Sequence, residues 1–286
     1  MAFGLVLGGG GVVGIAWEIG VIEALLEEQA MSPTEARTIV GTSAGSVVGT
    51  QLASGQSIDS LVEAQLAPPT PVGGGAAAPD MTAVMQIFGG FATAEEMTPE
   101  LARTTGRLAM EAPTGSEDAW VSSFERLLGG ATDWPDFDLR VVAMSCTKGE
   151  RRVWTRADAA VAPVTRAVAS SCAVPGLFPT VTIDGDRYTD GGAWSPSNAD
   201  LLAGEGLDQV LFIGPIGTFL AGTPQIEREM DLVKAKGSLP GWILPGEAFA
   251  DLRTQLMNPE FRRQGLEVGR QDGKAAAAGV RDALGG

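Results

Sequence analysis

The sequence predicts an α/β fold with neighbouring parallel strands whose following loops carry the chemistry. Residues 3–7 form a short apolar run that leads into four glycines and a helical pattern. Residues 38–40 form a β-branched run that leads into Gly-Thr-Ser-Ala-Gly and a second, small-residue helix. Each segment therefore predicts a strand, a tight loop and a helix. Because open α/β sheets form their sites at the carboxyl ends of the strands, we expect the two loops to lie side by side.

The remaining elements follow from apolar spacing and from turn residues. In the first helix, Ile15, Ile19 and Ile22 recur at helical spacing, and Glu18 is expected on another face with Glu23. Glycines and charged turns separate the later elements. The predicted helices are 46–53, 58–66, 163–172 and C-terminal helices at about 247–284, and the predicted strands are 139–145, 152–155, 181–183, a short strand ending at Asp190, and 209–213.

A helical insertion is expected at about 64–135, between the second and third strands. Residues 68–79 are rich in proline and glycine, which predicts a loop. A methionine-rich helix is expected over 81–91, and the following residues 95–130 are also expected to be helical. Two interpretations of 81–91 stay open: a cap helix packed on the body, or a lid over an acyl-chain pocket that contacts lipid.

Composition limits the classes of function. The 286 residues suffice for a full core, and 35 acidic against 20 basic residues give a formal net charge of −15. This charge argues against a nucleic-acid partner and against steady adhesion to an anionic membrane, but it allows brief contact with a membrane or micelle. The N-terminus lacks the cationic start of a signal peptide, and no apolar run approaches the ~18 residues of a spanning helix. A cytoplasmic protein with reduced Cys146 and Cys172 is therefore expected.

Ser43 lies at the centre of the second loop, between Gly41 and Gly45. In so tight a turn the serine takes a strained backbone conformation, and the two glycines avoid collisions with the strand and the helix. The Ser43 hydroxyl then stands at a helix N-terminus, a favourable place for a nucleophile. Because the chain contains no histidine, a Ser-His-Asp triad and a histidine-ligated zinc site are excluded. Any base for Ser43 must be another side chain.

The first loop contains Gly9, Gly11 and Gly14, which also match the G-x-G-x-x-G pattern of dinucleotide sites. Such a site needs an acidic residue at the end of the second strand, and none stands there. We therefore favour the alternative, in which consecutive glycine N–H groups at a helix N-terminus form an oxyanion hole beside Ser43. Neither a cofactor nor a metal is expected.

Asp190 ends a short strand and is followed by Gly191 and Gly192. On this pattern alone, two interpretations remain open: a turn aspartate that satisfies its own backbone, or a rigidly held functional carboxylate. Ser171 and Cys172, with the preceding serine, lack the flanking glycines of an elbow. We interpret them as part of a closely packed core helix.

Four sequence blocks together resemble the bacterial patatin-like phospholipases. They are residues 9–14, 41–45, 170–179 and 190–192, in the order typical of that family and within roughly residues 3–215. The resemblance implies a three-layer α/β/α fold with a mostly parallel central sheet. It also implies one acyl hydrolase domain over residues 1–286, including the helical insertion.

The resemblance further implies a Ser-Asp dyad that cleaves carboxylic esters of lipids. Ser43 would be the nucleophile and Asp190 the base. The oxyanion hole would be formed by the N–H groups of Gly9, Gly10 and Gly11. The supporting motif glycines would be Gly14, Gly41, Gly45, Gly191 and Gly192. Two other functions remain open: acyl transfer to an acceptor other than water, and a catalytically silent lipid- or nucleotide-binding protein.

Val13 departs from the family pattern, in which Lys or Arg typically precedes the last glycine of the first loop. Backbone N–H groups do not depend on that side chain, so the oxyanion hole can survive the change. A role for the missing cation in binding an anionic head group is put in doubt. Together with the net charge of −15, the valine favours neutral or zwitterionic ester substrates.

Overall fold

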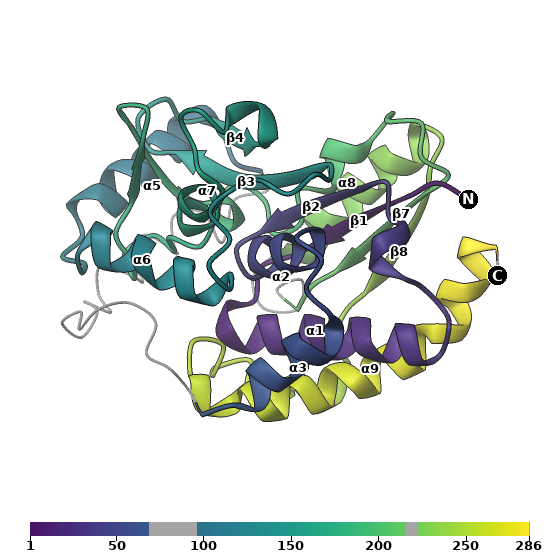
Figure 1. The fold of residues 1–286 in the computed structure, drawn as a ribbon. Helices are drawn as coiled ribbons and strands as arrows, with labels where there is room; N and C mark the ends of the chain where they lie inside the picture. Colours follow the sequence, from purple (N-terminus) through teal and green to yellow (C-terminus); the bar gives the residue numbers. More distant parts are fainter. Residues whose placement is uncertain (69–95, 216–221, 286) are drawn as a thin grey trace.

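The computed structural model describes residues 1–68, 96–215 and 222–285. In these ranges eight strands form one sheet, and helices lie on both of its faces (Figure 1). The described strands are β1 (Phe3–Leu7), β2 (Thr38–Thr42), β3 (Leu139–Ser145), β4 (Arg151–Trp154), β5 (Val181–Ile183), β6 (Asp186–Asp190), β7 (Gln209–Ile213) and β8 (Leu239–Ile243). The described helices are α1 (Gly11–Glu27), α2 (Ala44–Ala53), α3 (Ile58–Leu66), α5 (Pro99–Glu111), α6 (Glu117–Leu127), α7 (Val164–Ser171), α8 (Gly222–Ala235) and α9 (Arg262–Leu284).

The sheet is mostly parallel, in the order β5-β6-β3-β2-β1-β7-β8, with β4 paired to β3. Strands β3, β2, β1, β7 and β8 run parallel, whereas β4, β5 and β6 are antiparallel to their neighbours. Thr42 on β2 pairs with Val142 on β3, and Asp190 on β6 pairs with Ala143 on β3. The register therefore sets Ser43, the residue after β2, level with Asp190 on the other side of β3.

The two faces of the sheet bury separate apolar clusters. Along β1, Leu5 and Leu7 enter one cluster with residues of α1, α2 and α7, whereas Val6 enters the other with Met230 and Val233 of α8. This alternation is the period of two expected for a strand that is covered on both faces. The predicted α/β fold, with a mostly parallel central sheet flanked by helices, is confirmed.

Several predicted elements differ in detail from the structure. The helical segment 95–130 is two helices, α5 and α6, because the helix α5 ends before Pro113. Helix α8, which begins at Gly222, was not among the predicted helices. Strand β8 was not predicted, because Pro240 and Gly241 interrupt its pattern. The predicted helix 81–91 lies outside the described residues.

The position of the Glu18 side chain also differs from the prediction. The helical spacing placed it on a polar face of the first helix, but its side chain is fully buried in the structure. Helix α1 packs between the sheet, α2, α3 and α9, so apolar surroundings enclose it on more than one side (Figure 1). Burial raises the pKa of Glu18 well above its usual value. The folded protein therefore keeps the proton on Glu18 to a higher pH than the unfolded chain does.

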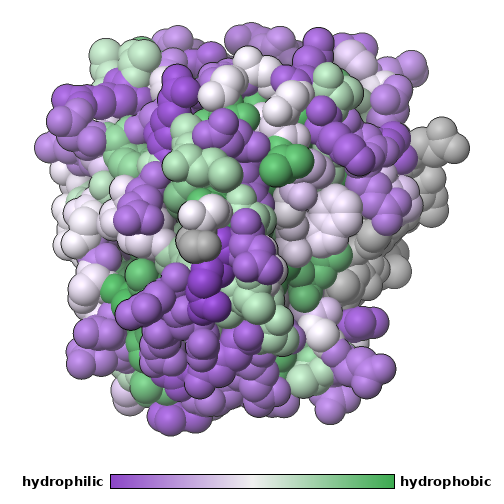
Figure 2. Space-filling model, turned by 90° about the vertical axis from the view of Figure 1, so that its right-hand side faces the viewer, coloured by the Kyte–Doolittle hydropathy of each residue, from purple (hydrophilic) through white to green (hydrophobic). Residues whose placement is uncertain are grey.

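The face of the molecule that Figure 2 shows is mostly polar. The face that carries both chain termini in Figure 1 shows small, separate apolar patches among hydrophilic side chains (Figure 2). Among the described residues, no helix combines the length and apolar character needed to cross a bilayer.

Candidate active site

Ser43 occupies a strained turn between β2 and α2. Its φ is 53° and its ψ is −118°, a conformation that residues with a Cβ rarely adopt. A Cβ at Gly41 would lie 2.6 Å from the Gly45 carbonyl oxygen, and a Cβ at Gly45 would collide with the carbonyl of Leu7. The two glycines thus allow β1, β2 and α2 to approach closely enough for this turn. The predicted strand, sharp turn and helix are present, and Ser43 borders a cavity.

Asp190 ends β6 and is buried, with 4% of its surface exposed. Its Oδ1 accepts a hydrogen bond of 2.7 Å from the Gly192 N–H. Burial raises the pKa of Asp190 to about 7, and hydrogen bonds from the Ser43 side chain and the Gly192 N–H act in the opposite direction. Gly191 lets this strand end lie against β3, because a Cβ there would collide with the Val142 carbonyl. The structure therefore brings Ser43 and Asp190 together.

The glycine loop after β1 lies beside the Ser43 turn. The Gly45 N–H donates a hydrogen bond of 2.8 Å to the carbonyl of Gly8, which joins the two loops. Gly10 is the N-cap of α1, and the Gly10 and Gly11 N–H groups have no acceptor among the described residues. By contrast, the Gly9 N–H lies 3.5 Å from the Pro196 carbonyl, a long contact. Free N–H groups at a helix N-terminus can bind an anion.

Gly14 and Val13 lie deeper in this loop. A Cβ at Gly14 would approach Ala44 to 3.6 Å, so the residue sits at the contact between α1 and α2. Val13 is fully buried, and its side chain lies where α1 meets Gly265 of α9. A cation at position 13 would therefore point into the interface between α1 and α9 and not toward Ser43.

Helix α7 also contacts the turn at Ser43. The Ser43 N–H donates to Ser171 Oγ at 2.9 Å, and the Cys172 thiol donates to the Ser43 carbonyl at 3.2 Å. Burial, followed by the nearby charge of Asp190, raises the pKa of Cys172 well above its usual value. The thiol thus stays protonated and acts as a donor. Ser170 is buried and donates to the Ala167 carbonyl, away from Ser43.

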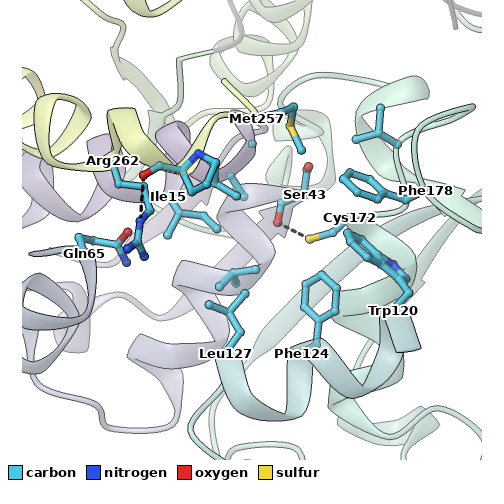
Figure 3. A pocket seen from close by; sticks show the side chains of 16 residues that line it. Ile15, Ser43, Gln65, Trp120, Phe124, Leu127, Cys172, Phe178, Met257 and Arg262 are labelled. Carbon is cyan, nitrogen blue, oxygen red and sulfur yellow. Dashed lines mark hydrogen bonds between the residues drawn. The ribbon is translucent and has the colours of Figure 1, made fainter. Parts of the chain in front are cut away.

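Ser43 opens into a cavity of about 270 Å³ (Figure 3). Trp120 and Phe178 stack at 4.0 Å in its wall, and the indole N–H of Trp120 donates to the Ala169 carbonyl. The apolar lining consists of Val12, Ile15, Ala44, Val47, Trp120, Phe124, Leu127, Val174, Phe178, Met257 and Pro259. Gln65, Cys172 and Arg262 add polar groups. A predominantly apolar cavity with a few polar groups is typical of a site for a small ligand or a hydrocarbon chain.

Comparison with known proteins identifies the family. The family model described as patatin-like phospholipase matches residues 5–203, more than half of the chain. The chain belongs to this family. The family, as its description states, is one of phospholipases, which act on lipid esters. No curated protein matches the chain significantly.

Two solved structures resemble this patatin-like chain. VipD from Legionella pneumophila is 17% identical, with a TM-score of 0.49, and the match covers 99% of this chain and 67% of VipD. The type III effector protein ExoU is 16% identical, with a TM-score of 0.45, and the match covers 98% of this chain and 53% of ExoU. The chain therefore spans about half the length of the ExoU chain.

Sequence reasoning missed a polar network behind the turn of this patatin-like protein. Asn198 is fully buried with a φ of 56°, and its Nδ2 donates to Thr42 Oγ1 at 3.0 Å, directly before Ser43. Glu229 of α8 accepts hydrogen bonds from Ser195 at 2.6 Å and from the Ala199 N–H at 2.9 Å. Buried polar groups require such partners. The serines and the asparagine that follow Gly192 indicated a polar cluster in the sequence. Nothing in the spacing of these residues predicts that they contact β2.

Proposed function

We propose that this chain is a serine acyl hydrolase that cleaves carboxylic esters of lipids through an acyl-Ser43 intermediate, with Asp190 as base. The observation that carries the proposal is the pairing of a serine in a strained turn with a buried carboxyl group whose pKa is about 7. A general base works best when its pKa lies near the working pH. The adjoining apolar cavity supports a substrate with a hydrocarbon chain.

The proposed reaction has two halves. Ser43 Oγ attacks the ester carbonyl while Asp190 accepts the hydroxyl proton, and the N–H groups of Gly9, Gly10 and Gly11 stabilise the oxyanion. The C–O bond to the alcohol then breaks, and the alcohol leaves with the proton from Asp190. Water next attacks the acyl-Ser43 carbonyl and gives a proton to Asp190. Collapse of this second intermediate releases the fatty acid and returns the proton to Ser43.

We also propose that helix α6, in the described part of the insertion predicted at about 64–135, caps the site. Helix α6 belongs to this segment and supplies Trp120, Phe124 and Leu127 to the cavity wall. Met257, which is 40% exposed, also lines the cavity. Apolar groups at the entrance would allow brief contact with a micelle or membrane surface during substrate capture.

Ester hydrolysis by matched variants tests this function. The substrates are p-nitrophenyl decanoate and a decanoyl phospholipid, and the variants are Ser43→Ala and Asp190→Asn. Each substitution is expected to lower kcat/KM at least about a thousandfold. The nucleophile and the base act in the same step, so removing either one removes most of the rate enhancement. Ser238→Ala is the control, since this buried hydroxyl donates to the Leu207 carbonyl far from Ser43. Full activity in Asp190→Asn would refute the dyad.

A further inference from the structure

The cavity at Ser43 has two chemically different ends. In Figure 3, Phe124 and Phe178 lie on one side of Ser43, whereas Gln65 and Arg262 lie on the other. A hydrocarbon chain is most stable against the aromatic wall, where it leaves water without covering polar groups. An ester with its carbonyl at Ser43 and its acyl chain on the aromatic side therefore directs its alcohol half toward Arg262.

Main-chain carbonyl groups fix the position of the Arg262 guanidinium. Nη2 donates to the Ala67 carbonyl at 2.7 Å, Nη1 to the Ala64 carbonyl at 3.3 Å and Nε to the Pro259 carbonyl at 3.3 Å. Ala64 and Ala67 stand at the C-terminal end of α3, where the helix dipole favours a cation. Since a guanidinium has five N–H donors, two remain for a ligand.

The charge of Arg262 is not balanced by a nearby carboxylate. In the described ranges no Asp or Glu lies within 4.0 Å of it, whereas Arg270 on the same helix pairs with Glu23 at 2.7 Å and with Glu267 at 2.5 Å. Burial lowers the pKa of Arg262, and Glu260 raises it from a longer distance. The three carbonyl groups and the C-terminal end of α3 stabilise this cation in part, and a bound anion would balance the charge that remains.

We propose that Arg262 binds an anionic group, a phosphate or a carboxylate, on the alcohol half of the ester substrate. This inference rests on the proposed function, because Ser43 must hold the ester carbonyl. It makes lipid esters with an acidic head group the preferred substrate class, in contrast to the expectation from Val13 and the net charge of −15. The net charge does not prevent such binding. Salt screens the repulsion from acidic residues that lie more than about 8 Å from the anionic group, so the attraction to Arg262, which contacts it, is the larger effect.

Arg263 provides a matched control. It follows Arg262 on α9, its side chain is exposed, and its Nη2 donates to the Leu66 carbonyl at 3.4 Å. It therefore contacts the same end of α3 but is absent from the cavity lining. The substitutions Arg262→Gln and Arg263→Gln each remove one positive charge, but the first removes two hydrogen bonds to α3 and the second removes one. A readout that compares two substrates on the same variant is therefore needed, because a general loss of packing lowers the activity toward both substrates.

The kinetic experiment compares decanoylglycerol with decanoylglycerol phosphate, which share the acyl chain and differ in head-group charge. The readout is the ratio of kcat/KM for the phosphate ester to kcat/KM for the neutral ester, and thermal unfolding confirms that each variant folds. We expect Arg262→Gln to lower this ratio tenfold to a hundredfold, as loss of a charge-assisted contact does, and Arg263→Gln to leave it within about twofold. Equal effects of the two substitutions, or an unchanged ratio in Arg262→Gln, would overturn the proposal.

A binding experiment separates this proposal from the catalytic one. Decyl phosphate is titrated calorimetrically into Ser43→Ala, with and without Arg262→Gln or Arg263→Gln. We expect Ser43→Ala to bind decyl phosphate, and we expect the affinity to fall at least tenfold when Arg262→Gln is added but not when Arg263→Gln is added. We expect no comparable binding of inorganic phosphate. Equal binding of decyl phosphate and inorganic phosphate would indicate a site for free phosphate and contradict the head-group assignment. If the wild-type chain hydrolysed no ester while this pattern held, the proposed function would fail and the Arg262 site would stand.

Discussion

The main-chain N–H of Ser43 donates a hydrogen bond of 2.9 Å to the side-chain oxygen of Ser171. The Ser171 hydroxyl in turn donates to the Val142 carbonyl on β3 at 2.6 Å. One buried hydroxyl thus ties the turn at Ser43 both to α7 and to the sheet. Because Ser43 has a φ of 53°, which favours glycine, such a contact helps to hold a strained backbone in place.

Ser171→Ala is predicted to lower kcat/KM for ester hydrolysis about tenfold or more and to reduce the free energy of unfolding by about 1–3 kcal/mol. The reason is that the Ser43 N–H loses its buried acceptor and the turn can relax. Ester kinetics and urea unfolding measure the two effects. Ser170→Ala removes a neighbouring buried hydroxyl that contacts the Ala167 carbonyl instead. An equal loss of activity in both variants would show that the Ser43 contact has no special role.

The activity is predicted to rise with pH through an apparent pKa of about 7. Asp190 must be ionised to accept the Ser43 proton, and its pKa is about 7 because it is buried. Below that pH the carboxyl is protonated, so kcat/KM should fall about tenfold per pH unit. A pH profile of kcat/KM from pH 5 to 9 measures this. Constant activity down to pH 5 would contradict the assignment of Asp190 as the base.

Glu18→Met is predicted to stabilise the fold at pH 7 by about 1–3 kcal/mol. Both carboxyl oxygens of Glu18 are buried, and burial raises its pKa in the folded state, while the nearby Gly8 N–H acts in the opposite direction and offsets this only in part. At pH values between the pKa of Glu18 in the unfolded chain and its pKa in the folded protein, only the folded protein keeps Glu18 protonated. The free energy of unfolding of the wild type therefore falls as the pH rises through this range. Thermal unfolding at pH 4.5 and pH 7 should show a gain that is larger at pH 7. A loss of stability would mean that Glu18 has a favourable partner.

The acyl-chain preference is predicted to level off near ten carbons. A 150 Å³ cavity holds benzene, or about 25 Å³ per carbon, so a cavity of about 270 Å³ that also holds part of the alcohol half accepts at most about ten acyl carbons. Each added CH₂ should raise kcat/KM about fourfold until the cavity is full. A series of p-nitrophenyl esters from C4 to C16 tests this. Leu127→Trp should move the plateau to shorter chains, and a continued rise to C16 in both proteins would rule out this cavity as the acyl site.

The parts of the fold with local signals could be predicted from the sequence. The strand before Gly41 and the helix after Gly45 are where the pattern placed them, because tight turns demand glycine locally. The pattern around Asp190 left its role open, and the resemblance to the patatin-like phospholipases implied a base there, in agreement with the absence of histidine; the structure sets Asp190 beside Ser43. In contrast, β8 contains Pro240, which is tolerated because β8 is an edge strand and needs fewer ladder hydrogen bonds.

The parts of the site that depend on tertiary packing could not be predicted. The polar cavity end formed by Gln65 and Arg262 joins α3 to α9, nearly 200 residues apart in the chain. The acceptor role of Ser171 requires knowing that α7 lies against the turn at Ser43. Glu18 has helical spacing typical of an exposed face, but its carboxyl lies near the Gly8 N–H after β1, and only the tertiary structure shows that this side of α1 is buried.

Covalent labelling tests the central claim most directly. The purified chain is treated with a fluorophosphonate, digested and mapped by mass spectrometry. We expect one modified serine, Ser43. Labelling should be abolished in Ser43→Ala and greatly slowed in Asp190→Asn, because the base that activates the hydroxyl is then missing. A folded wild-type protein that takes up no label, or that is labelled at Ser171 instead, would contradict this expectation.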